Sequence, residues 1–107
     1  MYVIGISACP TGIAHTYMAA DAIEKAAQNL GAEFKVETQG SIGIENKLTI
    51  DDINRADIVI ITAAVAVREF ERFQNYQHKI FVVSLQNVIA KGNELIKNEM
   101  MKRGILK

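Results

Sequence analysis

Short apolar runs rich in β-branched residues recur along the chain and predict strands that are buried on both faces. They are VIGIS (3–7), DIVIIT (57–62) and KIFVVS (79–84). The segment EFKVET (33–38) instead alternates polar and apolar residues, a period that predicts a half-exposed strand at the edge of a sheet. The pattern therefore predicts four strands.

Longer segments between and after these strands carry apolar residues at helical spacing. This spacing predicts an amphipathic helix over 16–30 and a terminal helix over 85–102. Thr49 and Asp52 have the spacing of a capping box, in which each side chain bonds the backbone N–H of the other, and they predict a short helix near 50–55. Strands and helices therefore alternate along the chain.

Two segments show no clear period. The glycine-containing stretch GSIGIENK (40–47) is expected to be a loop. The stretch AAVAVREFERFQNYQ (63–77) suits a helix, because Val67, Phe70 and Phe73 fall near one face, or a loop with a short helical turn. The sequence leaves these two alternatives open.

Alternating strands and helices predict an α/β fold with a parallel sheet, helices on both faces and right-handed crossovers, as in Rossmann-like proteins. We expect a single domain over 1–107 with an open four-stranded parallel sheet in the order 2-1-3-4, because the alternating second strand suits an edge. Ligands bind such sheets beyond the carboxyl ends of the strands, where the strand order reverses. The loop 9–15 leaves the first strand at this point.

Charge and cysteine content narrow the possible functions. Twelve basic side chains balance twelve acidic ones, so nucleic acid and anionic membrane surfaces are not expected as partners. The single cysteine excludes an internal disulfide and multi-cysteine metal or redox sites, which fits a reducing cytoplasm. Without a signal peptide or a run of about 20 apolar residues, the protein is expected to be cytoplasmic and not to insert into the membrane.

The segment SACPTGIAHT (7–16) joins the first predicted strand to the first predicted helix and holds the only cysteine and the only proline. A loop at a helix N-terminus presents unpaired backbone N–H groups and the positive end of the helix dipole, which together bind anions. Gly12 lets the backbone turn closely around a ligand, and Pro10 restricts it. The same fields favour a thiolate at Cys9, which is suited to accept a phosphoryl group.

The residues alone leave three alternatives to a phosphoryl carrier. In the first alternative, Cys9 is only a small buried side chain. In the second, the loop is a regulatory anion-binding module in which the thiol is incidental. The third alternative is a low-molecular-weight cysteine phosphatase, which needs an arginine six positions after the cysteine and an Asp-Pro acid loop. That position is His15 and the only proline is Pro10, so rapid hydrolysis is not expected.

Several motifs spread over nearly the whole chain resemble the fructose-type enzyme IIB of the bacterial phosphoenolpyruvate-dependent sugar phosphotransferase system (PTS). They are CPTGIAHT (9–16) with MAA (18–20), ETQGS (37–41) with Gly43, NKLT (46–49), DI (52–53), AD (56–57) and RF (72–73). The first motif and the Gln-Gly-Ser segment are the specific ones. One position departs from the family pattern. The family tends to have an acidic residue shortly after the third strand, whereas this chain has Val65 there.

The resemblance implies a phosphoryl relay. Enzyme IIA is expected to donate a phosphoryl group from a phosphohistidine to Cys9, which passes it to fructose or a fructose-like sugar carried by the membrane enzyme IIC. The implied phosphate-binding loop consists of Pro10, Thr11, Gly12, Ile13, Ala14, His15 and Thr16. No metal or organic cofactor is expected, and the protein would lie in the cytoplasm, peripheral to the inner membrane through enzyme IIC.

Other polar residues each have two interpretations. One set either rims the pocket or contacts a partner, or else lies in a plain turn, namely Gln39, Gly40 and Ser41. His15 either donates to phosphoryl oxygens or only caps the helix, and His78 is expected to be a solvated turn residue. Arg68 and Arg72 either bring positive charge to a phosphorylated site or, interleaved with glutamates, lie on a solvated helix face.

Overall fold

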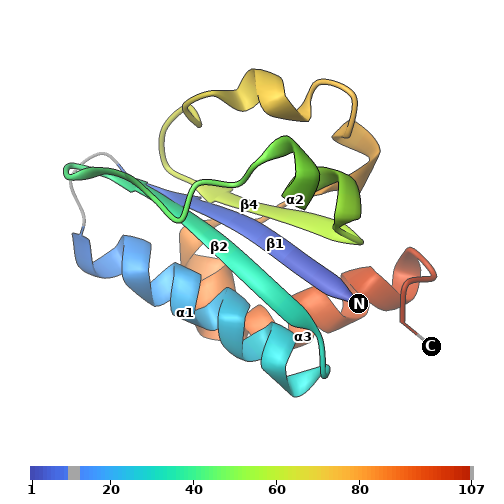
Figure 1. The fold of residues 1–107 in the computed structure, drawn as a ribbon. Coiled ribbons are helices and arrows are strands. Elements are labelled where there is room, and N and C mark those ends of the chain that lie inside the picture. Colours follow the sequence, from blue (N-terminus) through green and yellow to red (C-terminus); the bar gives the residue numbers. More distant parts are fainter. Residues whose placement is uncertain (10–12, 107) are drawn as a thin grey trace.

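The computed structural model describes residues 1–9 and 13–106, and its central element is a five-stranded mixed sheet in the order β3-β2-β1-β4-β5 (Figure 1). The strands are β1 (Tyr2–Ala8), β2 (Glu33–Gly40), β3 (Gly43–Glu45), β4 (Ile58–Ala63) and β5 (Ile80–Val82). β1 pairs in parallel with β2 and β4, and β4 pairs in parallel with β5. The protein therefore has the predicted α/β class.

The edge strand β3 corrects the prediction of a four-stranded, all-parallel sheet. Within the segment expected to be a loop, Ser41 and Ile42 form a two-residue turn, and β3 runs antiparallel to β2 with Gly40 opposite Gly43. Gly43 has φ +107°, a backbone conformation that favours glycine. Three residues are too few to show a strand period. The four parallel strands themselves lie in the order β2-β1-β4-β5.

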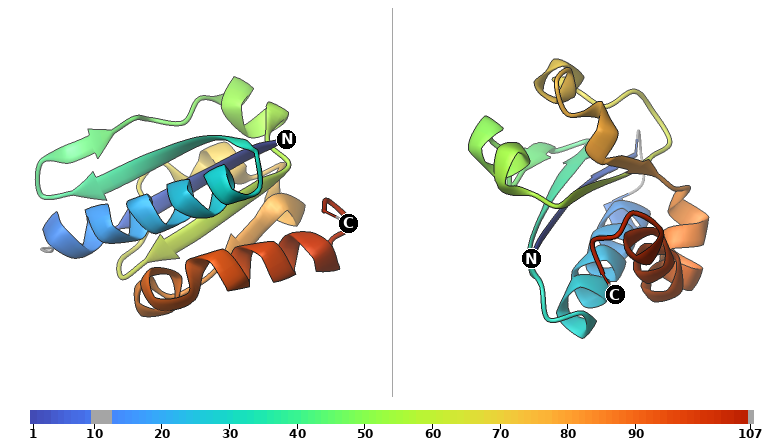
Figure 2. Two further views of the ribbon diagram at one scale, coloured as in Figure 1. Left: turned by 90° about the horizontal axis from the view of Figure 1, so that it is seen from below. Right: turned by 90° about the vertical axis from the view of Figure 1, so that its right-hand side faces the viewer.

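Helices cover both faces of the sheet (Figure 2). α1 (Ile13–Asn29) and α3 (Leu85–Lys102) pack against each other on one face, and α2 (Ile50–Arg55) lies on the other. α3 has the predicted bounds. α2 has the predicted capping box, in which the Thr49 hydroxyl accepts from the Asp52 N–H at 3.1 Å.

For residues 63–77 the loop with a short helical turn is the correct alternative. The turn is the 3-10 helix η1 (Phe70–Phe73), and a second one, η2 (Gln77–Lys79), precedes β5. Glu69 before η1 has φ +57°, and this left-handed backbone does not belong to a continuous right-handed helix. Phe73 is completely buried and holds the segment against the sheet.

Two apolar cores form because the side chains of each strand alternate between the two faces of the sheet. Val3 and Ile60 belong to the core under α1 and α3, whereas Ile4 and Ile61 belong to the core under α2 and η1. All four side chains are at most 5% exposed. The continuous apolar runs of β1 and β4 are therefore buried on both faces, as predicted. The same prediction for the run 79–84 is wrong, because β5 is an edge strand of the sheet and Val82 is 71% exposed.

Candidate active site

The carboxyl ends of the parallel strands lie along one side of the sheet, which we call the carboxyl edge. β1 ends there, and Cys9 follows it directly. The Cys9 N–H donates to the carbonyl of Gln39 in β2 at 3.1 Å, and the Ala64 N–H donates to the carbonyl of Ala8 at 2.9 Å. Cys9 is partly exposed. It therefore lies between the ends of β2 and β4, where the strand order reverses and where open α/β sheets bind their ligands.

The first turn of α1 is tied to the end of β1. Ser7 is completely buried, and its Oγ donates to the carbonyl of Thr16 at 2.8 Å. α1 begins at Ile13, earlier than the predicted residue 16, so that only residues 10–12 separate Cys9 from the helix. The N–H groups and the positive dipole end of α1 therefore lie at the same edge of the sheet as Cys9.

The structure describes part of the predicted phosphate-binding loop. Three of its members lie outside the described residues, namely Pro10, Thr11 and Gly12. The others form the first turn of α1, namely Ile13, Ala14, His15 and Thr16. Thr16 is buried, whereas the His15 side chain is exposed. A contact of His15 with phosphoryl oxygens stays a prediction.

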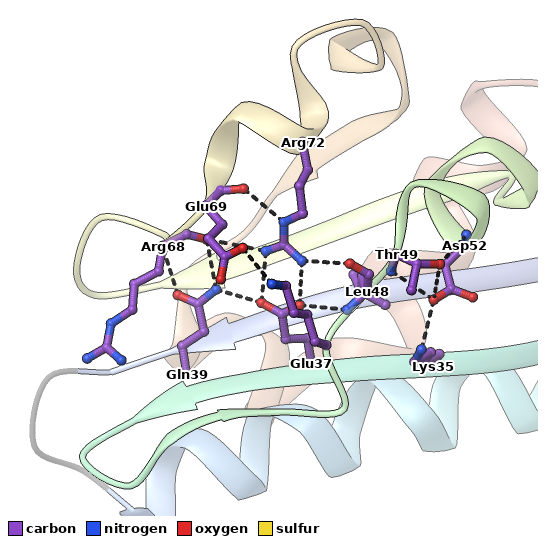
Figure 3. A network of polar contacts seen from close by, with 10 residues as sticks. Lys35, Glu37, Gln39, Leu48, Thr49, Asp52, Arg68, Glu69 and Arg72 are labelled. Carbon is purple, nitrogen blue, oxygen red and sulfur yellow. Dashed lines mark hydrogen bonds and ion pairs between the residues drawn. The ribbon is translucent and has the colours of Figure 1, made fainter.

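The predicted rim residues lie at the carboxyl end of β2, next to Cys9. Gln39 is buried, and its Oε1 accepts from the Arg68 N–H at 2.7 Å while its Nε2 donates to the Arg68 carbonyl at 3.1 Å (Figure 3). This pair of hydrogen bonds ties the segment after β4 to the end of β2. Gly40 and Ser41 lead into the turn toward β3, and Ser41 is exposed.

Glu37 is completely buried, although the alternating pattern of 33–38 predicts a half-exposed strand. Its carboxylate accepts four hydrogen bonds, from the Leu48 N–H at 2.7 Å, from Gln39 Nε2 at 2.6 Å and from the Arg72 guanidinium at 2.7 and 3.0 Å (Figure 3). Only 9% of the Arg72 side chain is exposed. The placement of Arg72 on a solvated helix face is therefore wrong, because this buried carboxylate binds it.

The hydrogen bonds among Glu37, Gln39, Leu48 and Arg72, here called the Glu37 network, favour the charged forms of Glu37 and Arg72. Burial alone raises the pKa of Glu37, but the hydrogen bonds from Arg72, Gln39 and the Leu48 N–H lower it by more, so its pKa lies below the ordinary value. The hydrogen bond from Arg72 to Glu37 raises the pKa of the Arg72 guanidinium in turn. Arg72 is thus occupied inside the protein and does not present its charge to a ligand.

Arg68, by contrast, is exposed, and Figure 3 shows its side chain extending from the segment after β4 toward the carboxyl edge of the sheet. Val65, which stands where the resembling family tends to have an acid, is 42% exposed on the same segment. His78 is exposed in η2, as expected of a solvated turn residue. Arg68 and Val65 therefore lie near the carboxyl edge, on the segment that follows β4, whereas His78 lies in η2.

In the two described stretches, 1–9 and 13–106, no group of three or more His, Cys, Asp or Glu side chains is arranged to hold a metal ion. Over that same part of the chain, no helix is both long enough and apolar enough to cross a membrane.

A family model and curated relatives match most of the chain. The model described as "PTS system, Lactose/Cellobiose specific IIB subunit" matches residues 4–98. The "PTS system fructose-like EIIB component 1" of Escherichia coli K12 is 45% identical over 94 residues, which cover 88% of this chain and 85% of the relative. The "PTS system fructose-like EIIB component 2" of the same strain is 56% identical over 71 residues, covering 66% and 67%.

Solved structures agree with these matches. The solution structure of an enzyme IIB subunit of the PTS from Escherichia coli K12 has a TM-score of 0.86 at 42% identity and covers 96% of this chain and 94% of that chain. A domain of a fructose-specific IIABC component from Borrelia burgdorferi has a TM-score of 0.83 at 38% identity, covering 94% and 93%. An arginine phosphatase with a TM-score of 0.58 is only 13% identical and shares the fold alone.

The matches extend over the elements that build the carboxyl edge, from β1 through the segment after β4. The chain therefore belongs to the PTS IIB family and is a phosphotransferase subunit of a sugar-uptake system.

Proposed function

We propose that Cys9 carries the phosphoryl group in a relay from a phosphohistidine of enzyme IIA to a sugar held by the membrane enzyme IIC. The observation that carries this proposal is the position of Cys9, which directly follows β1 at the carboxyl edge, close in sequence to the N-terminus of α1. An anion there meets the N–H groups of the first helical turn and the positive end of the dipole. These fixed dipoles would stabilise a phosphocysteine.

The relay consists of two displacements at phosphorus. In the first, the Cys9 thiolate attacks the phosphorus of the phosphohistidine, so that an S–P bond forms while the P–N bond breaks and the imidazole nitrogen keeps the electron pair. In the second, a sugar hydroxyl oxygen attacks the same phosphorus, an O–P bond forms and the S–P bond breaks. The thiolate is regenerated, and the hydroxyl proton passes to a base of enzyme IIC or to water.

The loop 10–16 is the phosphate-binding loop in this proposal, and the turn at Gly40 and Ser41 forms the rim on the side of β2. The whole chain, 1–107, acts as one IIB domain. It works in the cytoplasm and reaches the inner membrane through enzyme IIC.

The named relatives favour one class of sugar. Two curated relatives are fructose-like components and one solved relative belongs to a fructose-specific component, whereas the description of the family model names lactose and cellobiose. The identities of 56% and 45% join this chain to the fructose-like proteins. We therefore assign fructose or a fructose-like sugar as the final acceptor.

Hydrolysis must be distinguished from transfer, because a phosphatase shares the fold. A cysteine phosphatase takes an arginine from the loop itself to fork the equatorial phosphoryl oxygens, and His15 occupies that position here. An Asp-Pro acid loop is also absent from the sequence, in which Pro10 is the only proline. We therefore expect the phosphocysteine to persist until an acceptor arrives.

The test is intact-mass spectrometry at mildly alkaline pH after incubation with phosphoenolpyruvate, the general PTS proteins and a fructose-type enzyme IIA. The wild-type protein is expected to gain one phosphoryl group and Cys9→Ala none. His78→Gln is the matched control, because histidines are the other phosphoryl acceptors of such relays and His78 is exposed in η2, outside the phosphate-binding loop. This variant is expected to gain the group. A gain in Cys9→Ala, or none in the wild type, would overturn the proposal.

A further inference from the structure

We propose that Arg68 binds the phosphoryl group on Cys9 and that Gln39 positions Arg68 by holding its backbone. This inference rests on the proposed function, because it names the cation that meets the phosphocysteine. Arg68 lies between β4 and η1, whereas Cys9 follows β1, so the two residues approach the carboxyl edge from different segments.

Gln39 connects these two segments. Its carbonyl accepts from the Cys9 N–H at 3.1 Å, and its side-chain amide makes hydrogen bonds of 2.7 and 3.1 Å to the N–H and carbonyl of Arg68. The amide is fixed in turn, because Nε2 also donates to the buried Glu37 carboxylate at 2.6 Å. Gln39 therefore links the Arg68 backbone to Cys9, and Arg72 Nη2 adds a hydrogen bond of 3.2 Å to the same Arg68 carbonyl.

The Arg68 guanidinium is available for a ligand, unlike the other guanidinium groups of the chain. Carboxylates of Glu33, Glu37 and Glu99 contact those of Arg55, Arg72 and Arg103, respectively. Among the residues that the structure describes, the Arg68 guanidinium has no hydrogen-bond or ion-pair partner. The carboxylate of its neighbour Glu69 contacts Lys47 instead, at 2.6 Å.

The direction of the side chain suits this role. Figure 3 shows Arg68 extending away from the Glu37 network, toward the end of the sheet at which β1 leads into Cys9. A guanidinium presents parallel N–H donors that match two oxygens of a phosphoryl group. Charge spreads over the equatorial oxygens while phosphorus passes between donor and acceptor, so a positioned guanidinium stabilises both displacements.

The test compares single-turnover phosphorylation of the wild-type chain with that of Arg68→Gln, Arg68→Lys and Arg55→Gln, using phosphorylated fructose-type enzyme IIA as donor. Arg55→Gln is the matched control, because Arg55 ends α2 before the amino end of β4 and its loss changes the net charge equally. Substitution of Arg68 should leave the fold intact, because Gln39 binds only its backbone.

Arg68→Gln is expected to slow phosphorylation roughly 10- to 100-fold, the scale of lost hydrogen bonds to a charged group. Arg68→Lys is expected to be slowed less, because the ammonium keeps the charge but not the fork. Arg55→Gln should match the wild type. A second readout is the 31P titration of the phosphorylated protein, whose midpoint should move to higher pH in Arg68→Gln because the dianion loses its cation.

Arg68→Gln with wild-type rates and an unchanged 31P midpoint overturns the role of Arg68 and leaves the proposed function standing. A wild-type protein that takes up no phosphoryl group overturns both. Gln39→Met tests the positioning, because its effect on the rate is expected to vanish in the Arg68→Gln background. An equal effect in both backgrounds would show that Gln39 does not act through Arg68.

Discussion

Glu37 and Arg72 form a buried ion pair that joins β2 to η1, with 2.7 Å between Arg72 Nη1 and Glu37 Oε1. The Glu37 carboxylate also binds the amide of Gln39 and the N–H of Leu48. It therefore fixes groups from three segments within the core under α2. Since Gln39 holds the backbone of Arg68, this pair links the stability of the fold to the geometry beside Cys9.

Arg72→Met is expected to lower the free energy of unfolding by about 3–5 kcal/mol, because it leaves the buried Glu37 charge without its counter-ion. Urea denaturation at neutral pH measures the loss. Arg55→Met is the matched control, because Arg55 and Glu33 are exposed and 3.8 Å apart, and it should cost less than about 1 kcal/mol. Similar small losses in both variants would contradict a charged, buried Glu37.

Asp52 is expected to make the protein sensitive to acid. Burial raises the pKa of Asp52, but hydrogen bonds from Lys35, Thr49 and Tyr2 lower it by more and leave it well below the ordinary value. A depressed pKa in the folded state stabilises the fold above the unfolded pKa of about 3.9, and this contribution is lost as pH falls through the folded pKa. The free energy of unfolding should therefore decrease below about pH 4–5.

Asp52→Asn should reduce this pH dependence but not abolish it, because Glu37 with its lowered pKa also contributes. Urea denaturation at neutral and acid pH measures the reduction. Asp51→Asn is the control, because Asp51 is the exposed neighbour in the same helical turn. An acid sensitivity that persists unchanged in Asp52→Asn, or that Asp51→Asn reduces by as much, would refute the prediction.

The hydrophobic periods predicted most of the fold because they report which faces are buried. The runs at 3–7 and 57–62 became the central strands, and the terminal helix over 85–102 has the predicted bounds. Cys9 at the carboxyl edge followed from the same pattern, since the switch point depends on the strand order alone.

Glu37, Arg72 and β3 could not be predicted in this way. A period marks Glu37 as polar and hence exposed, but its partner Arg72 lies far away in the sequence and becomes visible only when the chain is folded. The sequence held one indication that Glu37 is buried. The residues of β1 and β4 that lie on the same face of the sheet as Glu37 are apolar and form a core there. β3 depends on the turn at Ser41 and Ile42 and on only three residues, which carry no period.

Gly5→Ala is expected to destabilise the protein by about 1–3 kcal/mol, because overpacking a filled core forces side chains or backbone to shift. A Cβ at Gly5 would lie 3.1 Å from Ile23 Cδ1 and 3.1 Å from the Ile60 carbonyl oxygen. Gly40→Ala is the control, since its Cβ would meet nothing within 4 Å, and it should change stability by less than about 0.5 kcal/mol. Thermal denaturation that ranks the two variants in the opposite order would contradict this packing.

Thr62→Val is expected to stabilise the protein by about 1 kcal/mol, because an unpaired buried hydroxyl costs free energy that a methyl group does not. Within 1–9 and 13–106, Thr62 Oγ1 is the one buried side-chain N or O atom without a hydrogen-bond partner. Ser7 lies opposite Thr62 across β1 and β4, and its hydroxyl is bound to the Thr16 carbonyl.

Ser7→Ala should therefore have the opposite sign and lower the free energy of unfolding by about 1 kcal/mol, since it removes a satisfied hydrogen bond. The two substitutions each delete one buried hydroxyl from neighbouring strands, so differences in solvent or temperature cancel in the comparison. Urea denaturation in which Thr62→Val loses as much stability as Ser7→Ala would show that the Thr62 hydroxyl is hydrogen-bonded in solution.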